Sequence, residues 1–150
     1  MCIFFAVTPD PVVFSVFAQQ TSFQLSQGLI VPFDSVLTDV GGNFFVGGNC
    51  FYCPQDGVYE FAVYLTTTAG RSAKLSIRRN GISIASTFAN AGGADDFGAG
   101  GNSVISLCFD GEVVDVITTA DSYLYGGRHL MFTGRLLFSD LSTYPGTLYI

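Results

Sequence analysis

The chain has no tryptophan, a single histidine and only six lysine and arginine residues among 150. A metal centre built on imidazoles needs several histidines, so His129 alone does not predict one. Twelve Asp and Glu residues outnumber the six cations, which argues against broad electrostatic binding to nucleic acid. Charged residues make up 12% of the chain, against ~25% in a typical soluble domain. We therefore expect an oligomer that buries part of the surface; the alternative is a surface covered by uncharged Ser, Thr, Asn and Gly.

Long hydrophobic runs and catalytic motifs are also absent. No stretch approaches the ~20 apolar residues of a membrane-spanning helix, so we expect no membrane insertion. The apolar residues 1–7 have no basic flank and run into Pro9 and Pro11, unlike a signal peptide, although a secreted protein without its signal would look the same. A nucleophile elbow, a histidine-based triad and a glycine-rich nucleotide loop between strand and helix are all missing. The sequence therefore predicts a binding protein rather than an enzyme.

Four cysteines occur, at Cys2, Cys50, Cys53 and Cys108. Cys50 and Cys53 form a CxxC pair, but no second pair follows and the local pattern is that of a strand, so we interpret them as packed thiols rather than as a zinc or redox site. Strand alternation places Cys53 and Cys108 in the core and Cys50 on the face opposite to Cys53. Their even number leaves the disulfide state open.

Much of the sequence shows the residue alternation typical of β-strands. Apolar residues alternate with polar ones between turn signals, and no long segment shows helical periodicity with caps. About ten strands at this spacing favour a sandwich or jelly roll of two antiparallel sheets. The predicted strands are 12–18, 29–31, 34–39, 43–53, 57–67, 73–79, 82–88, 103–109, 112–118 and 131–138.

The sharpest turn signal is Asn80-Gly81, which predicts a type I′ hairpin because these residues accept positive φ at both positions. Leu75 and Ile77 before this turn are predicted to face the core. The residues expected to share an inner face on the following strand are Ile82, Ile84 and Phe88.

Two glycine-rich features interrupt the strand pattern. The unit VGGN occurs at 40–43 and again at 46–49, which is too short for a structural repeat and indicates turns or a bulged strand. Residues 89–102 are predicted to be a long loop, which in a compact domain is either functional or poorly ordered.

The spacing of aromatic residues identifies a family resemblance. The pattern consists of Phe33, Asp39, Phe44, Phe51 and the run Gly57-Val58-Tyr59-Glu60-Phe61. It resembles the signature of the complement component 1q head domain, with Val63 where the family has a further aromatic. Segments 108–114 and 132–138 are similar to two later family motifs, with Cys108 in a leucine position and Arg135 in an aromatic position. The resemblance covers residues 12–138, flanked by an N-terminal segment 1–11 and a C-terminal extension 139–150.

The resemblance implies an all-β, ten-strand jelly roll of two antiparallel sheets that assembles as a homotrimer, as tumour-necrosis-factor ligands also do. The strand 57–67 agrees, because Tyr59 and Phe61 fall on one face while Ala62 and Tyr64 fall on the other. Apolar residues on both faces fit a sandwich within a trimer, and Tyr64 is the candidate interface residue. No Gly-x-y repeat is present, so we expect either a head domain alone or a head domain separated from its collagen stalk.

Candidate ligand contacts lie at Tyr123, Tyr125, Arg128 and His129, around the turn after Gly126-Gly127. For His129 the alternative is an exposed turn residue without a ligand.

The resemblance also suggests calcium, since relatives that bind it use the loop after the strand ending at Phe88. Here Asn90 replaces the family's carboxylate, and Asp95 and Asp96 are the candidates to supply charge. The alternative is a solvated acidic loop.

The family resemblance favours a secreted, innate-immune recognition protein whose trimer binds microbial surface glycans or polysaccharides, like a lectin. Two alternatives remain: a cytokine-like ligand that binds a receptor between subunits, and a structural trimeric cap or matrix protein.

Overall fold

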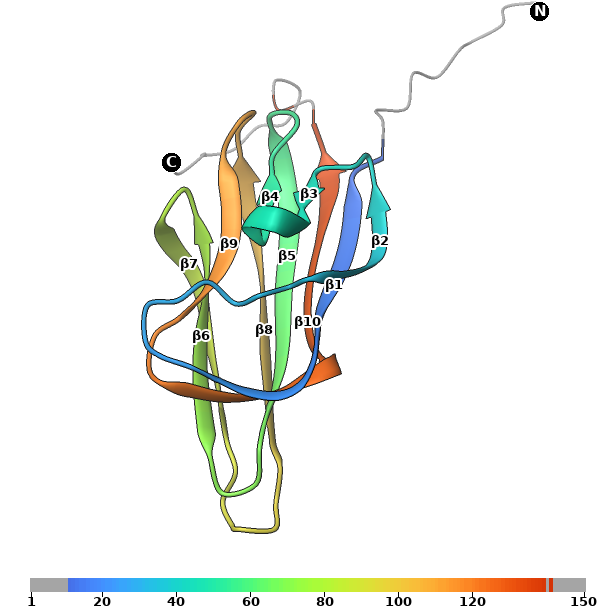
Figure 1. The fold of residues 1–150 in the computed structure, drawn as a ribbon. Helices are drawn as coiled ribbons and strands as arrows, with labels where there is room; N and C mark the ends of the chain where they lie inside the picture. The colour runs from blue at the N-terminus through green and yellow to red at the C-terminus, as the bar shows by residue number, and fades with distance from the viewer. Residues whose placement is uncertain (1–10, 140, 142–150) are drawn as a thin grey trace, which may run out of the picture.

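A computed structural model describes residues 11–139 and residue 141. Cys2, the predicted segment up to residue 10 and most of the predicted extension 139–150 lie outside these residues. The described residues include no helix long and apolar enough to cross a membrane. The chain forms these elements (Figure 1): β1 Val13–Leu25, β2 Ser35–Val40, β3 Phe44–Phe45, the 3-10 turn η1 Val46–Gly48, β4 Cys50–Tyr52, β5 Gly57–Thr67, β6 Ser72–Arg79, β7 Ile82–Asn90, β8 Gly98–Cys108, β9 Val113–Thr118 and β10 Ser122–Phe138.

The strands form two five-stranded antiparallel sheets. Sheet 1 has the order β2-β1-β10-β5-β8, and sheet 2 has the order β3-β4-β9-β6-β7. Strands from the two ends of the domain are neighbours in sheet 1, because β1 pairs with β10 over nearly its whole length. This order is that of a jelly roll, and the predicted ten-strand jelly roll of two antiparallel sheets is confirmed.

The core between the sheets is built from phenylalanine rings. Phe14 of β1 stacks on Phe51 of β4 with ring centroids 4.8 Å apart, and Phe132 of β10 meets it edge-on at 5.0 Å. Such pairs add to the free energy gained by burying apolar area. A further aromatic pair, Tyr59 and Phe61, stacks along β5 at 5.9 Å. The spaced aromatics of the sequence therefore meet in one cluster that joins both sheets.

A glycine makes room for this cluster. A Cβ at Gly134 in β10 would collide with the ring of Phe14 and lie 2.9 Å from the ring of Phe61. Gly134 pairs with both neighbouring strands, since it lies opposite Phe14 of β1 on one side and opposite Phe61 of β5 on the other. The glycine of the 132–138 motif is thus explained by ring packing rather than by backbone conformation.

The alternation predicted for strand 57–67 is confirmed. Tyr59, Phe61, Val63 and Leu65 are all buried, whereas Tyr64 on the other face is 53% exposed. Ala62 on that outer face is also largely covered. Both faces of β5 are therefore apolar, as the sequence predicts.

The Asn80-Gly81 hairpin is confirmed, with φ of 51° and 82° at the two turn residues. Of the three residues expected to share an inner face on the strand that follows, only Ile84 packs against the core, so the prediction is wrong for Ile82 and Phe88. Ile82 lies next to the turn and is 71% exposed. A β-bulge then shifts the register, so Arg78 pairs with Ser83 but Ile77 pairs with Ala85. Because one extra residue moves every later side chain to the opposite face, Phe88 points outward and is 66% exposed.

Two predicted strands differ from the structure. Residues 29–31 form no strand but cross the sandwich with a single bridge from Ile30 to Ile117 (Figure 1). Residues 43–53 are not one strand, because the turn η1 separates β3 from β4. The Val46–Gly48 turn ends at Asn49, which adopts a left-handed conformation with φ of 55°.

Other strands are longer than predicted. The first strand, predicted over 12–18, continues to Leu25. The loop predicted over 89–102 is shorter, because β8 already begins at Gly98. Gly98 and Gly100 let β8 approach the backbone of β7, where a Cβ would collide with the carbonyls of Asn90 and Phe88. The last strand begins at Ser122, not at residue 131, and its pairing with β1 skips residues 128–130.

The three described cysteines are free and buried. Cys53 and Cys108 belong to the core cluster, as predicted. Cys50 is also covered, with 7% exposure, although it lies outside that cluster. Burial raises the pKa of Cys50, while a hydrogen bond with the Cys108 thiol lowers the pKa of Cys53 and raises that of Cys108.

We expect these thiols to resist modification. In a Cys2→Ser variant, maleimide at pH 8 should modify Cys53 and Cys108 far more slowly in native protein than in guanidinium, because reaction requires opening of the core. Mass spectrometry of the labelled peptides measures this. Rapid native labelling of Cys53 and Cys108 would show that the strand register around β4 and β8 is wrong.

Candidate functional site

The outer face of sheet 1 is a candidate interaction surface, and we call it the assembly face. One row of paired residues crosses all five strands and has apolar ends and an ion pair in its middle. The row reads Val40, Val13, Arg135, Glu60 and Ile105. Ile105 is 61% exposed, and both valines at the other end are also exposed. Exposed apolar side chains gathered on one sheet face are typical of a surface that packs against a partner.

The ion pair in the middle of the row joins Arg135 Nε to Glu60 Oε1 at 3.0 Å. It is partly exposed, so it contributes little to the stability of a single subunit. The next row on this face lies two residues away along each strand. It consists of small residues, among them Ser15, Thr133 and Ala62. The face is therefore flat at its centre and nearly neutral in charge.

Tyr64 lies in the third row of the assembly face, two residues beyond Ala62 along β5. A Cβ on Gly101 would lie only 2.7 Å from the Tyr64 ring, so the ring lies across β8 where a glycine leaves space. A hollow of about 520 Å³ borders Tyr64 and the Ala99–Ser103 stretch of β8. This large, half-exposed ring beside a shallow hollow fits the predicted interface role of Tyr64.

The four residues predicted to contact ligand do not form one group. Tyr125 and His129 come together, with ring centroids 4.8 Å apart. Arg71 lies over the ring of Tyr123 at 4.5 Å, and Arg128 lies 6.0 Å from the ring of Phe17. The residues skipped in the β1–β10 pairing include Arg128 and His129, which explains why both side chains are exposed.

A residue that sequence reasoning missed completes the Tyr125 group. Phe97 packs edge-on against Tyr125 with centroids 5.4 Å apart, although it is itself 59% exposed. Together with Thr66 and His129 these rings line a hollow of about 300 Å³. The sequence feature that could have indicated this role of Phe97 is a single phenylalanine within a glycine-rich loop. The chain's single histidine therefore lies against a tyrosine ring.

The residues predicted to bind calcium are exposed and separate in the sequence. Asn90 ends β7, whereas Asp95 and Asp96 lie in the loop before β8. Within the described part of the chain, no three His, Cys, Asp or Glu side chains gather in a way that could hold a metal ion. Calcium prefers six to eight oxygen ligands.

We expect weak calcium binding or none. Isothermal calorimetry on chelator-treated protein should give a dissociation constant no tighter than about 10⁻⁴ M, and an Asp95→Ala/Asp96→Ala variant should lose any heat that remains. Tight binding that the double substitution leaves unchanged would place the metal elsewhere in the molecule.

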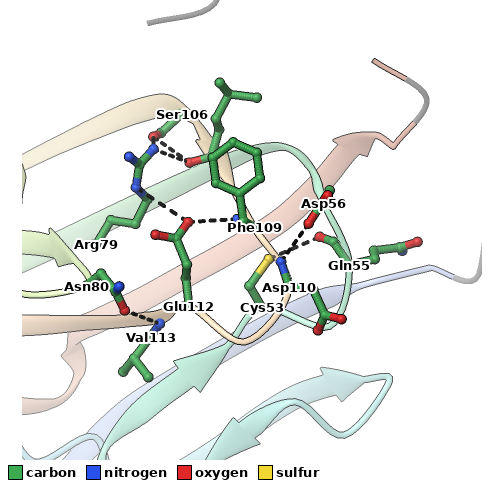
Figure 2. Close-up of polar contacts among 11 residues, drawn as sticks. Cys53, Gln55, Asp56, Arg79, Asn80, Ser106, Phe109, Asp110, Glu112 and Val113 are labelled. Carbon is green, nitrogen blue, oxygen red and sulfur yellow. Dashed lines mark hydrogen bonds and ion pairs between the residues drawn. The ribbon is translucent and has the colours of Figure 1, made fainter. Parts of the chain in front are cut away.

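A polar network around the turn between β8 and β9 has a structural role (Figure 2). Arg79 from sheet 2 donates to the Leu107 carbonyl of sheet 1 at 2.6 Å and to Ser106 Oγ at 3.1 Å. Glu112 accepts a hydrogen bond from the Phe109 N–H at 2.8 Å and lies 3.7 Å from Arg79. These groups satisfy one another and fix the turn between β8 and β9, so they offer little to a ligand.

Comparisons with known proteins agree with this architecture. Residues 13–137 match the family model of the C1q domain. Zebrafish (Danio rerio) Caprin-2 is 29% identical over 113 residues, which are 73% of this chain and 12% of that protein, so the chain spans about an eighth of its length.

Solved structures share the fold at low identity. The globular domain of zebrafish complement 1qA has a TM-score of 0.72 at 20% identity and covers 86% of this chain and 99% of its own. The Eiger TNF of S. frugiperda reaches 0.73 at 10% identity, over 93% of this chain and 100% of its own. Murine APRIL reaches 0.65 at 8% identity, over 85% of this chain and 99% of its own.

Proposed function

Since the chain belongs to the C1q domain family, we propose that it acts as a secreted homotrimeric recognition module that binds microbial surface glycans. Domains of this family are in general binding modules rather than enzymes, and are typically extracellular. The proposal concerns this domain alone, because the curated relative is much longer.

The assembly face is the main support for the proposal that the protein forms a trimer. Its exposed apolar residues, including Tyr64 and Ile105, surround a neutral centre, and the apolar interfaces of obligate oligomers resemble a domain core. Burying this face would also account for the low charge content of the chain. A trimer presents three equal binding surfaces, so weak single contacts to a repeated glycan add up to strong binding.

A glycan and bacterial-polysaccharide array tests the recognition function. We expect saturable binding of the purified protein to at least one microbial polysaccharide, with displacement by the free polysaccharide. Absence of saturable binding to every polysaccharide would contradict the proposal and favour a structural cap. The predicted contacts at Tyr123, Tyr125, Arg128 and His129 stay predictions; alanine substitution of Tyr125 and His129 on the same array tests the hollow that they share with Phe97.

A cytokine-like receptor ligand is the second candidate. The fold similarity to Eiger TNF is as high as that to complement 1qA, with TM-scores of 0.73 and 0.72. A receptor ligand need not bind any polysaccharide, so saturable and displaceable binding on the array would favour glycan recognition over receptor binding.

A further inference from the structure

We propose that an exposed pair of aromatic rings, Phe45 and Tyr52, binds a neutral sugar ring of a glycan; we call this pair the aromatic platform. Phe45 is 55% exposed and Tyr52 is 46% exposed, with centroids 6.3 Å apart and ring planes at 57°. They lie on β3 and β4, at one edge of sheet 2. This inference rests on the proposed glycan recognition and gives it a location.

The repeated VGGN unit builds the platform. Gly41 and Gly42 of the first copy turn the chain with φ of 103° and 69°, and the second copy forms the η1 turn. The two turns leave only Phe44 and Phe45 between them as β3, so alternation buries the first ring and exposes the second. The motif therefore has a role in placing one aromatic ring on the surface.

The Phe45 ring is held in place although half of it is exposed. A Cβ on Gly47 would lie 3.2 Å from the end of the ring, and one on Gly48 would lie 2.8 Å from its Cδ1. A side chain at either position would press on the ring, so these glycines let the η1 backbone lie against it. A ring that is already ordered loses little conformational entropy when a ligand stacks on it.

A hollow beside the rings has the size and lining for one sugar. It measures about 230 Å³ and is lined by Phe45, Tyr52, the Phe44 backbone region, Gly42 and Asn43. Sugar rings present apolar C–H faces that stack on aromatic rings, and hydroxyl groups at their edges that need hydrogen-bond partners. Asn43 brings a carboxamide with both donor and acceptor groups. Its backbone is fixed by Asp39, whose carboxylate accepts the Asn43 N–H at 3.2 Å.

The chemistry of the lining selects a neutral sugar. None of the residues around the hollow carries a positive charge, and Asp39 lies just behind it. An anionic sugar or a phosphate would therefore find no cation and a nearby carboxylate, which disfavours both.

The size of the platform argues against a protein partner. Two half-exposed aromatic residues offer on the order of 200 Å², whereas a stable protein interface buries ~800 Å² on each partner. The platform also belongs to sheet 2, while the assembly face belongs to sheet 1. In the proposed trimer it would stay accessible on each subunit.

Binding of the full chain to immobilised laminarin and mannan, two neutral polysaccharides, tests this site, with heparin as the anionic comparison. We expect wild-type protein to bind laminarin or mannan, and a Phe45→Ala/Tyr52→Ala variant to bind at least about tenfold more weakly, because stacking on both rings is lost. The matched control is Phe88→Ala, which removes an even more exposed ring from the opposite edge of sheet 2 and should bind as wild type. Size-exclusion chromatography and circular dichroism check that each variant keeps its assembly and fold.

A direct readout uses the absence of tryptophan from the chain. Phe45→Trp keeps a stacking ring, should retain binding, and makes residue 45 the sole tryptophan. Its fluorescence should change on titration with soluble laminarin or mannan oligosaccharides. Wild-type binding that survives in the double alanine variant, without a fluorescence change in Phe45→Trp, would overturn the platform and leave glycan recognition standing. Binding to heparin alone would overturn the neutral-sugar assignment, and binding to none of the three would overturn the platform, while glycan recognition itself is decided by the polysaccharide array.

Discussion

Replacement of Phe14 by alanine is expected to lower the free energy of unfolding by about 3–5 kcal/mol, a large part of the 5–15 kcal/mol that typically stabilises a domain. Phe14 is 1% exposed and contacts the rings of Phe44, Phe51, Phe61 and Phe132, which come from both sheets. Its removal leaves a cavity where the sheets are joined. Guanidinium denaturation at one fixed protein concentration measures the loss, because any subunit association contributes to apparent stability.

Phe88→Ala is the control for this substitution. It removes the same side chain from a position that is 66% exposed, so it should change the free energy of unfolding by less than about 0.5 kcal/mol. Equal losses for the two variants would contradict the register of β7 and the location of the core.

Replacement of Tyr64 by aspartate should dissociate the trimer before it unfolds the subunit. In the proposed interface the new carboxylate would lose its hydration without gaining a partner, and it would do so once in every subunit. We expect the dissociation constant to rise at least about 100-fold. In the free subunit Tyr64 is 53% exposed, so the same carboxylate remains in water and the fold should persist.

Light scattering separates these effects when combined with far-ultraviolet circular dichroism. The control is Ile82→Asp, at a position 71% exposed beside the β6–β7 turn in sheet 2, which should stay assembled. A Tyr64→Asp variant that remains fully associated, or an Ile82→Asp variant that dissociates, would move the interface away from the assembly face.

The parts of the fold that could be predicted depend on local pattern. Tyr59, Phe61, Val63 and Leu65 alternate without interruption in β5, so their burial follows from the period of a strand. The Asn80-Gly81 turn likewise follows from the φ preferences of two residues.

The incorrect predictions arise where distant strands decide the local structure. The bulge at Ile84 turns Phe88 outward, and no neighbouring residue signals it. Gly98 and Gly100 suggest a loop by composition, but they belong to β8 because that strand passes close to β7. Residues 128–130 are skipped in the pairing with β1, which lies more than one hundred residues earlier.

The candidate sites were predictable in part for the same reason. Tyr64 could be predicted as an exposed apolar residue because it follows the alternation of β5. The Tyr125 and His129 pair was within reach because both residues lie close in the sequence, but the contribution of Phe97 depends on how the loop before β8 folds back. The Phe45 and Tyr52 platform depends on two turns whose geometry the repeated glycines permit but do not specify.

The most direct test of the proposed trimer is the mass of the protein in solution. Light scattering on a size-exclusion column should give three times the chain mass of 16.0 kDa at micromolar concentration. A monodisperse monomer of 16.0 kDa under these conditions would contradict the proposed trimer and leave the apolar assembly face without its partner.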